Sequence, residues 1–239
     1  MHDDDANDDS IDADLILFDT MILYGNAMSA EKSFSEALDW YESALSSNPD
    51  KSPIHPSNLR AWYNKGVTLF RNGDPIGSLE AFGIIVGEMN KNSTTLPTGI
   101  ASVLNTMGTI YFKVNHFASA IERFTESLSL ENECLSPCQR AGVLCNIATA
   151  YYRLEHYEES ESFCRKALII AHSLGQTSHH LKATIMCKLG YLFYRKKDYP
   201  RAHSLFSDGK SRLYVLLSFL PIATRKSTCP HAFPRPKLH

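Results

Sequence analysis

The chain has 239 residues, of which 44% are apolar and 21% are charged, and its formal net charge is −2. This composition provides ample material for a continuous hydrophobic core, and the absence of long runs that alternate apolar and polar residues excludes a β-rich fold. The expected class is therefore all-α.

Residues 1–14 contain seven Asp and neither Lys nor Arg, so the rest of the chain carries 24 basic against 19 acidic residues. A segment this acidic cannot bury apolar surface, and we expect residues 1–14 to form a disordered leader. A calcium loop is the alternative, but the segment lacks the central Gly and the closing Glu of such loops. It also lacks the positive charge and the apolar run of a secretory signal, which predicts a cytoplasmic protein.

One pattern occurs five times between residues 15 and 209. Each copy has a small residue on a first apolar stripe of helical spacing, then a tight turn, then a second such stripe. The small residues follow one another at intervals of 41, 42, 40 and 42 residues, and they are Gly25, Gly66, Gly108, Ala148 and Gly190. A fixed period in this range predicts stacked helical hairpins, because one hairpin cannot bury its own apolar face. We expect hairpins at residues 18–49, 59–91, 101–132, 141–174 and 183–209.

The middle copies carry the residues of a known repeat. Trp62, Gly66 and Phe82 of the second copy match the Trp, Gly and Phe of the tetratricopeptide-repeat (TPR) pattern, and the chain resembles this family over about residues 15–209. The resemblance implies an all-α, right-handed α-solenoid of about five TPR-like helical hairpins. The usual TPR period is about 34 residues. The longer period here is similar to that of the kinesin light chain and of the Pins-related spindle-orientation adaptors.

The resemblance also implies that the first helices line a concave groove that binds peptides. When the small residue counts as position 8, a rotation of about 100° per residue independently places positions 5, 9, 12 and 13 opposite the core stripe. Position 12 is aromatic and position 13 is a cation in four successive copies, and three Asn occupy position 5 or 6. The predicted groove residues are Asn64, Phe70, Arg71, Asn105, Phe112, Lys113, Asn146, Tyr152, Arg153, Lys188, Tyr194 and Arg195.

These residues also have a purely structural interpretation. Position 12 could pack against the following helix, and a cation at position 13 favours the dipole at the C-terminus of the first helix. Neither role explains the Asn residues, which are unfavourable inside helices but can hydrogen-bond the main chain of an extended peptide. Asn combined with cations predicts an acidic partner peptide. The acidic leader is an intramolecular candidate for the same surface.

No site for catalysis emerges from the sequence. It contains no Gly-rich phosphate loop, nucleophile elbow or paired-His motif, so we expect neither enzymatic activity nor a cofactor. The predicted function is a non-catalytic protein–protein interaction scaffold that binds an extended, acidic peptide in the TPR groove. A permanent structural subunit of a large assembly has the same sequence signature. An RNA-binding helical-repeat protein has weaker support, because the basic excess outside the leader is small.

The chaperone-tail carboxylate clamp known in the family is not expected, because its cation positions hold Ile22, Ser102 and Thr106. The six Cys are expected to be reduced thiols. Cys134 and Cys138 have a spacing that suggests metal ligands, but no second Cys or His pair follows, and no metal site is expected.

Residues 210–239 are expected to form an apolar and then Pro-rich basic tail. The apolar run at residues 213–223 is far shorter than the ~20 residues of a membrane span. A cap on the repeat stack and the remnant of a truncated array are the two interpretations of this tail.

Overall fold

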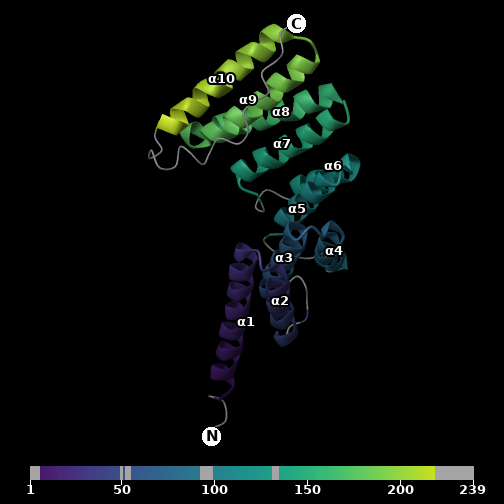
Figure 1. The fold of residues 1–239 in the computed structure, drawn as a ribbon, viewed down its shortest axis with the longest axis vertical. Coiled ribbons are helices and arrows are strands. Elements are labelled where there is room, and N and C mark those ends of the chain that lie inside the picture. The colour runs from purple at the N-terminus through teal and green to yellow at the C-terminus, as the bar shows by residue number, and fades with distance from the viewer. Residues whose placement is uncertain (1–5, 49–50, 52–54, 92–98, 131–134, 219–239) are drawn as a thin grey trace. The chain divides into compact units, whose positions relative to one another are not determined.

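The computed structural model describes residues 6–48, 51, 55–91, 99–130 and 135–218. These residues contain ten α-helices and a short 3₁₀ turn, η1 (Gly175–Ser178), and no strand (Figure 1). The predicted all-α class is therefore confirmed. The helices are α1 (Ala6–Glu31), α2 (Phe34–Ser47), α3 (Pro56–Arg71), α4 (Pro75–Lys91), α5 (Ile100–Lys113), α6 (Phe117–Ser129), α7 (Pro137–Arg153), α8 (Tyr157–Ser173), α9 (His179–Arg195) and α10 (Tyr199–Ser218).

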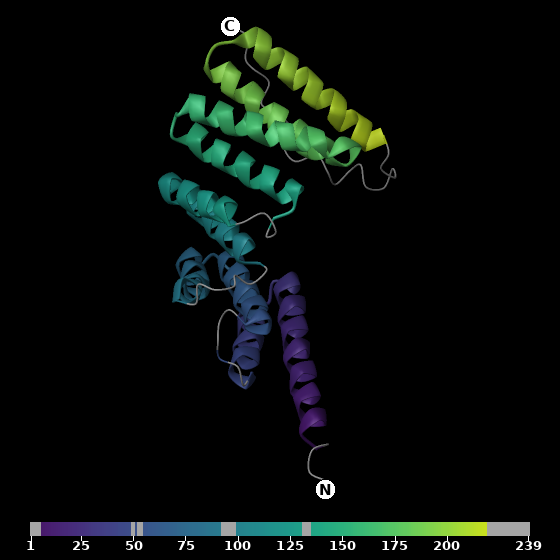
Figure 2. The ribbon, with the colours of Figure 1, turned by 180° about the vertical axis from the view of Figure 1, so that it is seen from behind.

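Consecutive helices pair into hairpins, and the hairpins stack as a helical-repeat solenoid within two compact units. Unit 1, Met1–Leu135, contains the hairpins α1–α2, α3–α4 and α5–α6, and unit 2, Ser136–His239, contains α7–α8 and α9–α10. Between hairpins, the second helix of one packs against the first helix of the next, as α8 does against α9 (Figure 2). The core of unit 1 shows the result, because Phe82 of α4 and Leu104 of α5 belong to one buried cluster.

Two helices extend beyond the expected repeat boundaries. Helix α1 begins at Ala6, so the part of the acidic leader from residue 6 onward is helical rather than disordered. Helix α10 continues to Ser218, past the expected end of the array at residue 209. Residues 1–5 and 219–239, and with them the rest of the leader and of the tail, lie outside the described residues.

A close contact between a small residue and a ring joins the two helices of four hairpins. A Cβ added to the glycine would come within 2.5 to 2.7 Å of a ring carbon on the second helix, so the ring occupies the space that any larger residue would need. The fourth hairpin differs, because Ala148 and Cys164 stand at the corresponding positions. The four pairs are Gly25 with Tyr41, Gly66 with Phe82, Gly108 with Phe124, and Gly190 with Phe206.

The turn inside each hairpin contains a residue with a left-handed backbone conformation. The residue seven positions after the small residue has a positive φ, between 63° and 86°. The next backbone N–H then donates to a carbonyl in the last turn of the first helix, as His116 donates to Tyr111 at 2.8 Å. This is a Schellman-type helix end, which reverses the chain in few residues. The five left-handed residues are Lys32, Gly73, Asn115, Glu155 and Lys197.

No helix among the described residues is long and apolar enough to cross a membrane.

Candidate functional site

The predicted groove residues lie on the first helices of four hairpins, and they divide equally between the two units. Unit 1 holds six of them on α3 and α5, and unit 2 holds the other six on α7 and α9.

Two polar residues at position 6 join neighbouring hairpins. The Nδ2 of Asn64 donates to the Oδ1 of Asn26 at 2.9 Å, and the Tyr41 hydroxyl donates to the same oxygen at 2.8 Å. In unit 2, the Nζ of Lys188 donates to the Oγ1 of Thr149. Asn26 and Thr149 both occupy position 9 of the preceding hairpin. A side-chain hydrogen bond from position 6 to position 9 therefore links hairpins one and two in unit 1, and hairpins four and five in unit 2.

Three of the four aromatic residues at position 12 pack against the start of the second helix in their own hairpin. The ring centroids of Phe112 and Phe117 lie 5.3 Å apart, and those of Tyr194 and Tyr199 lie 5.7 Å apart. Tyr152 pairs with Tyr157 at 5.9 Å, and Phe70 packs against the core of unit 1. These ring contacts agree with the structural interpretation for Phe112, Tyr152 and Tyr194. Tyr194 nevertheless keeps 53% of its surface exposed.

The cations at position 13 do not form a uniform row. Arg71 donates to the Oγ of Ser29 at 3.2 Å and stands 5.7 Å over the Phe34 ring, so it bridges to the preceding hairpin. Arg195 reaches the Tyr157 hydroxyl at 3.3 Å and the Glu155 carboxylate at 3.6 Å. The hydrogen bond to the Tyr157 hydroxyl, with smaller contributions from Tyr152 and Glu155, raises the pKa of Arg195. Lys113 and Arg153 are exposed.

The three Asn residues differ in their surroundings. Asn64 makes the interhairpin bond to Asn26, whereas the Oδ1 of Asn105 is buried and has no hydrogen-bond partner among the described residues. Asn146 is partly buried on α7. The three Asn residues therefore do not share one hydrogen-bonding arrangement.

Unit 2 contains a cavity of about 240 Å³ that is bounded by α7, α8 and α9. Its walls are mainly apolar, and two of the predicted residues, Tyr152 and Lys188, contribute to it. Burial raises the pKa of the Cys164 thiol to about 12, so this lining residue carries no charge at physiological pH. Sequence reasoning missed the cavity, although the replacement of the usual Gly and ring by Ala148 and Cys164 was a visible signal. The lining residues are Ala148, Thr149, Tyr152, Ser160, Cys164, Lys188 and Tyr191.

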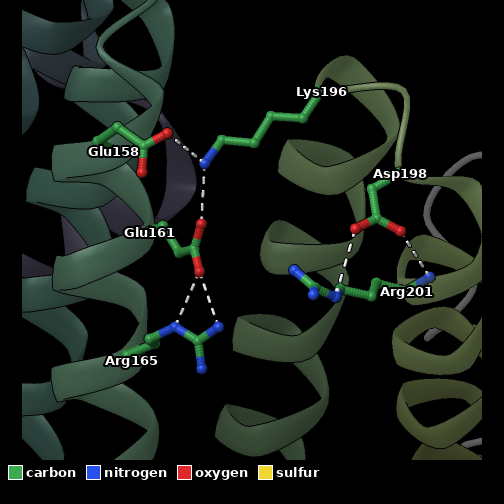
Figure 3. A network of polar contacts seen from close by, with 6 residues as sticks. All are labelled: Glu158, Glu161, Arg165, Lys196, Asp198 and Arg201. Atoms are coloured by element: carbon green, nitrogen blue, oxygen red, sulfur yellow. Dashed lines mark hydrogen bonds and ion pairs between the residues drawn. The ribbon is translucent and has the colours of Figure 1, made fainter.

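An ion-pair network joins the hairpins of unit 2 near their turns (Figure 3). The Nζ of Lys196 contacts Glu158 at 2.8 Å and Glu161 at 2.9 Å, and Arg165 binds Glu161 at 2.7 Å. Burial by itself raises the pKa of Glu161, but the hydrogen bonds from Lys196 and Arg165 outweigh it, so the net pKa is lowered. Glu161 is therefore a carboxylate that holds α8 to the start of the α9–α10 turn.

Two stretches of the chain match the tetratricopeptide-repeat family, residues 25–83 and residues 139–209. Together with the hairpin geometry, these matches decide the family. The chain is a TPR protein. The Gly25 and Gly66 contacts fall in the first stretch, and the Lys188 cavity falls in the second.

Several solved structures share the fold at low sequence identity. BtubC (BKLC) from P. vanneervenii has a TM-score of 0.78 at 16% identity, over 96% of this chain and 89% of that one. TPR-like repeats of Podosopora anserina, described as those of a kinesin light chain, have a TM-score of 0.70 at 13% identity, over 83% of this chain and 95% of that one. PilF of Pseudomonas aeruginosa has a TM-score of 0.60 at 18% identity, over 82% of this chain and 78% of that one.

TPR proteins bind other proteins, and the repeats are typically interaction modules rather than catalytic ones. Among the described residues, no group of three or more His, Cys, Asp or Glu side chains is placed to hold a metal ion. Cys138, Cys145, Cys164 and Cys187 are free thiols, and Cys134 lies outside the described residues.

Proposed function

We propose that this TPR protein is a non-catalytic scaffold in the cytoplasm that binds an extended acidic peptide on its first helices, with no cofactor. The first helices carry the cations and polar groups that such a peptide would need. Unit 2 supports this most directly, because there a cation, an exposed aromatic and a cavity occur on neighbouring helices α7 and α9.

The ammonium group of Lys188 carries the proposal. It is partly buried, and its described contact is the hydroxyl of Thr149. No carboxylate among the described residues forms an ion pair with it. A cation that is partly removed from water gains from a carboxylate partner, and charge-assisted hydrogen bonds are about twice as strong as neutral ones. An acidic side chain of a bound peptide would supply that carboxylate.

Other groups on the same helices extend the surface. Arg153 is exposed at the end of α7, and Tyr194 is exposed on α9. In unit 1, Lys113 is exposed at the end of α5. Arg71 and Arg195 already make contacts within the protein, so they are weaker candidates for direct ligand contact than the sequence pattern indicates.

The test uses a short fluorescein-labelled peptide of alternating Glu and Ala, and its counterpart with Gln in place of Glu. Fluorescence anisotropy is measured for the wild type and for Lys188→Gln, which removes the charge but keeps a hydrogen-bond donor for Thr149. We expect the Glu peptide to bind the wild type and to lose about tenfold in affinity with Lys188→Gln, which corresponds to about 1.4 kcal/mol.

The matched control is Lys166→Gln. It removes an exposed cation from α8, the second helix of the fourth hairpin, which packs against the α9 helix of Lys188. It should leave the affinity unchanged. Equal binding of the Glu and Gln peptides, or equal losses for the two Lys variants, would show that the acidic-peptide assignment is wrong.

A further inference from the structure

The fourth hairpin lacks a ring that the other hairpins contain. In those hairpins, Tyr41, Phe82, Phe124 and Phe206 each fill the space beside a glycine. In the fourth, Ala148 replaces the glycine and Cys164 replaces the ring. The methyl group of Ala148 occupies some of the space that a ring fills in the other hairpins. It is far smaller than a phenyl ring, so part of that volume stays unfilled.

The cavity of about 240 Å³ lies where this ring is missing. Its lining includes both members of the substituted pair, Ala148 and Cys164, together with Ser160, which ties α8 to α7 by donating to the Ala148 carbonyl at 2.7 Å. The hairpin is thus held together without the ring, and the space stays open. In the second hairpin, Ser78 makes the same bond to Gly66 at 2.6 Å, but Phe82 fills the space.

The walls of the cavity fit an aromatic ring. Ala148 and Cys164 are buried and apolar, and Tyr152 and Tyr191 add two aromatic side chains. Tyr191 is 42% exposed, so the cavity opens to the surface on the side of α9. Apolar protein cavities of about 150 Å³ take up benzene. The volume here is larger, and it suits a ring with a short connecting chain.

A cation lies among the residues that line the cavity. Lys188 on α9 and Thr149 on α7 are both in the lining, and they are hydrogen-bonded to each other. A ligand that places a ring between Ala148 and Cys164 would therefore bring a neighbouring carboxylate within reach of the Lys188 ammonium group.

We infer that this cavity is a binding site for an aromatic ring joined to a carboxylate, presented by an acidic peptide in which an aromatic side chain lies next to Glu or Asp. The ring takes the place of the one that hairpin four lacks. This inference rests on the proposed function and specifies the ligand of the same surface. A free arylcarboxylate has the same chemistry, so the experiment includes both sources.

The experiment compares the wild type with Ala148→Gly/Cys164→Phe, which rebuilds in hairpin four the pair found in the others. The probes are the Glu–Ala peptide, the same peptide with one central Phe, and free 4-fluorophenylacetate followed by ¹⁹F NMR. In the wild type, we expect the Phe peptide to bind about tenfold tighter than the Glu–Ala peptide. In the double variant, that preference should disappear, because the internal Phe fills the site.

The control Ile169→Phe adds a ring at a position on α8 that is 70% exposed, and it should keep the preference. Circular dichroism and thermal unfolding check that the double variant is folded. If it is not, Cys164→Met, which fills only part of the cavity, takes its place and should reduce the preference.

The outcomes separate the two proposals. A Phe preference that survives the double variant, or its absence in the wild type, overturns the cavity assignment even if the Glu peptide binds. A Phe preference without any dependence on Glu overturns the acidic-peptide function but keeps the cavity. Binding of 4-fluorophenylacetate without binding of the Phe peptide would show a small-molecule site and overturn the peptide assignment.

Discussion

The ring of Phe124 packs so closely on Gly108 that a Cβ at position 108 would lie 2.6 Å from two of the ring carbons. Real Cβ contacts are not this short, so α5 and α6 can approach as they do only with glycine at this position. Three further hairpins repeat the contact, and it sets the spacing of the two helices in each.

Gly108→Ala should therefore destabilise the protein by about 1–3 kcal/mol, because the added methyl group overpacks a buried contact. The measurement is the free energy of unfolding in urea. Gly83→Ala is the matched control, since a Cβ on this exposed glycine of α4 meets nothing within 4 Å. Alanine is the better helix former by about 0.5–1 kcal/mol, so the control should stabilise the protein. Equal effects of the two variants would contradict the steric role of Gly108.

The turn residues predict a stabilising substitution. Lys197 has a φ of 63°, which is unfavourable for a residue with a side chain, and its neighbour Asp198 donates its backbone N–H to Phe193 at 2.9 Å. Lys197→Gly should stabilise the protein by about 1 kcal/mol, since glycine adopts this conformation without the Cβ clash. Gly73→Ala, at the equivalent turn, should have the opposite sign. A rise in melting temperature for the first and a fall for the second are the expected results, and a fall for both would contradict the strain argument.

The Glu161 network predicts a pH dependence in acid. The pKa of Glu161 is lowered in the folded protein, so its contribution to stability is present above the pKa of the unfolded chain and is lost as the pH falls through the folded value. Glu161→Gln should cost about 1 kcal/mol at neutral pH and less below about pH 4. Urea unfolding at the two pH values measures this. A cost that does not change with pH would mean that Glu161 stabilises the protein through packing rather than charge.

The Cys164 thiol predicts a pH dependence in alkali. Burial raises its pKa to about 12, with Cys145 adding to the effect, so the thiol stays neutral in the folded protein while the unfolded chain ionises. Stability is fully present below the unfolded pKa and falls as the pH rises from about 9 toward 12, by up to about 1.4 kcal/mol per pH unit. Cys164→Ala should show a shallower decline between pH 8 and about pH 10.5. An identical decline in both proteins would mean that Cys164 is not protected from ionisation.

The repeat architecture was predictable because it depends on local pattern. The spacing of Gly25, Gly66, Gly108, Ala148 and Gly190 alone predicts five hairpins, and the structure places these residues on five successive first helices. The helix ends were less predictable. Helix α10 runs through Gly209, a residue that usually weakens a helix, because Gly209 is buried against α9, where an added Cβ would lie 3.3 Å from the Cys187 sulfur.

The amino-acid sequence by itself determined the all-α class, the hairpin period and the presence of polar and aromatic rows on the first helices, because helical periodicity is a property of neighbouring residues along the chain. Only the tertiary structure decided which members of those rows are engaged in contacts within the protein. Arg71 is engaged by Ser29, more than 40 residues away, whereas Lys188 faces a cavity that exists because a ring is absent from another helix. Such contacts arise from packing between hairpins, and residue spacing within one hairpin carries no information about them.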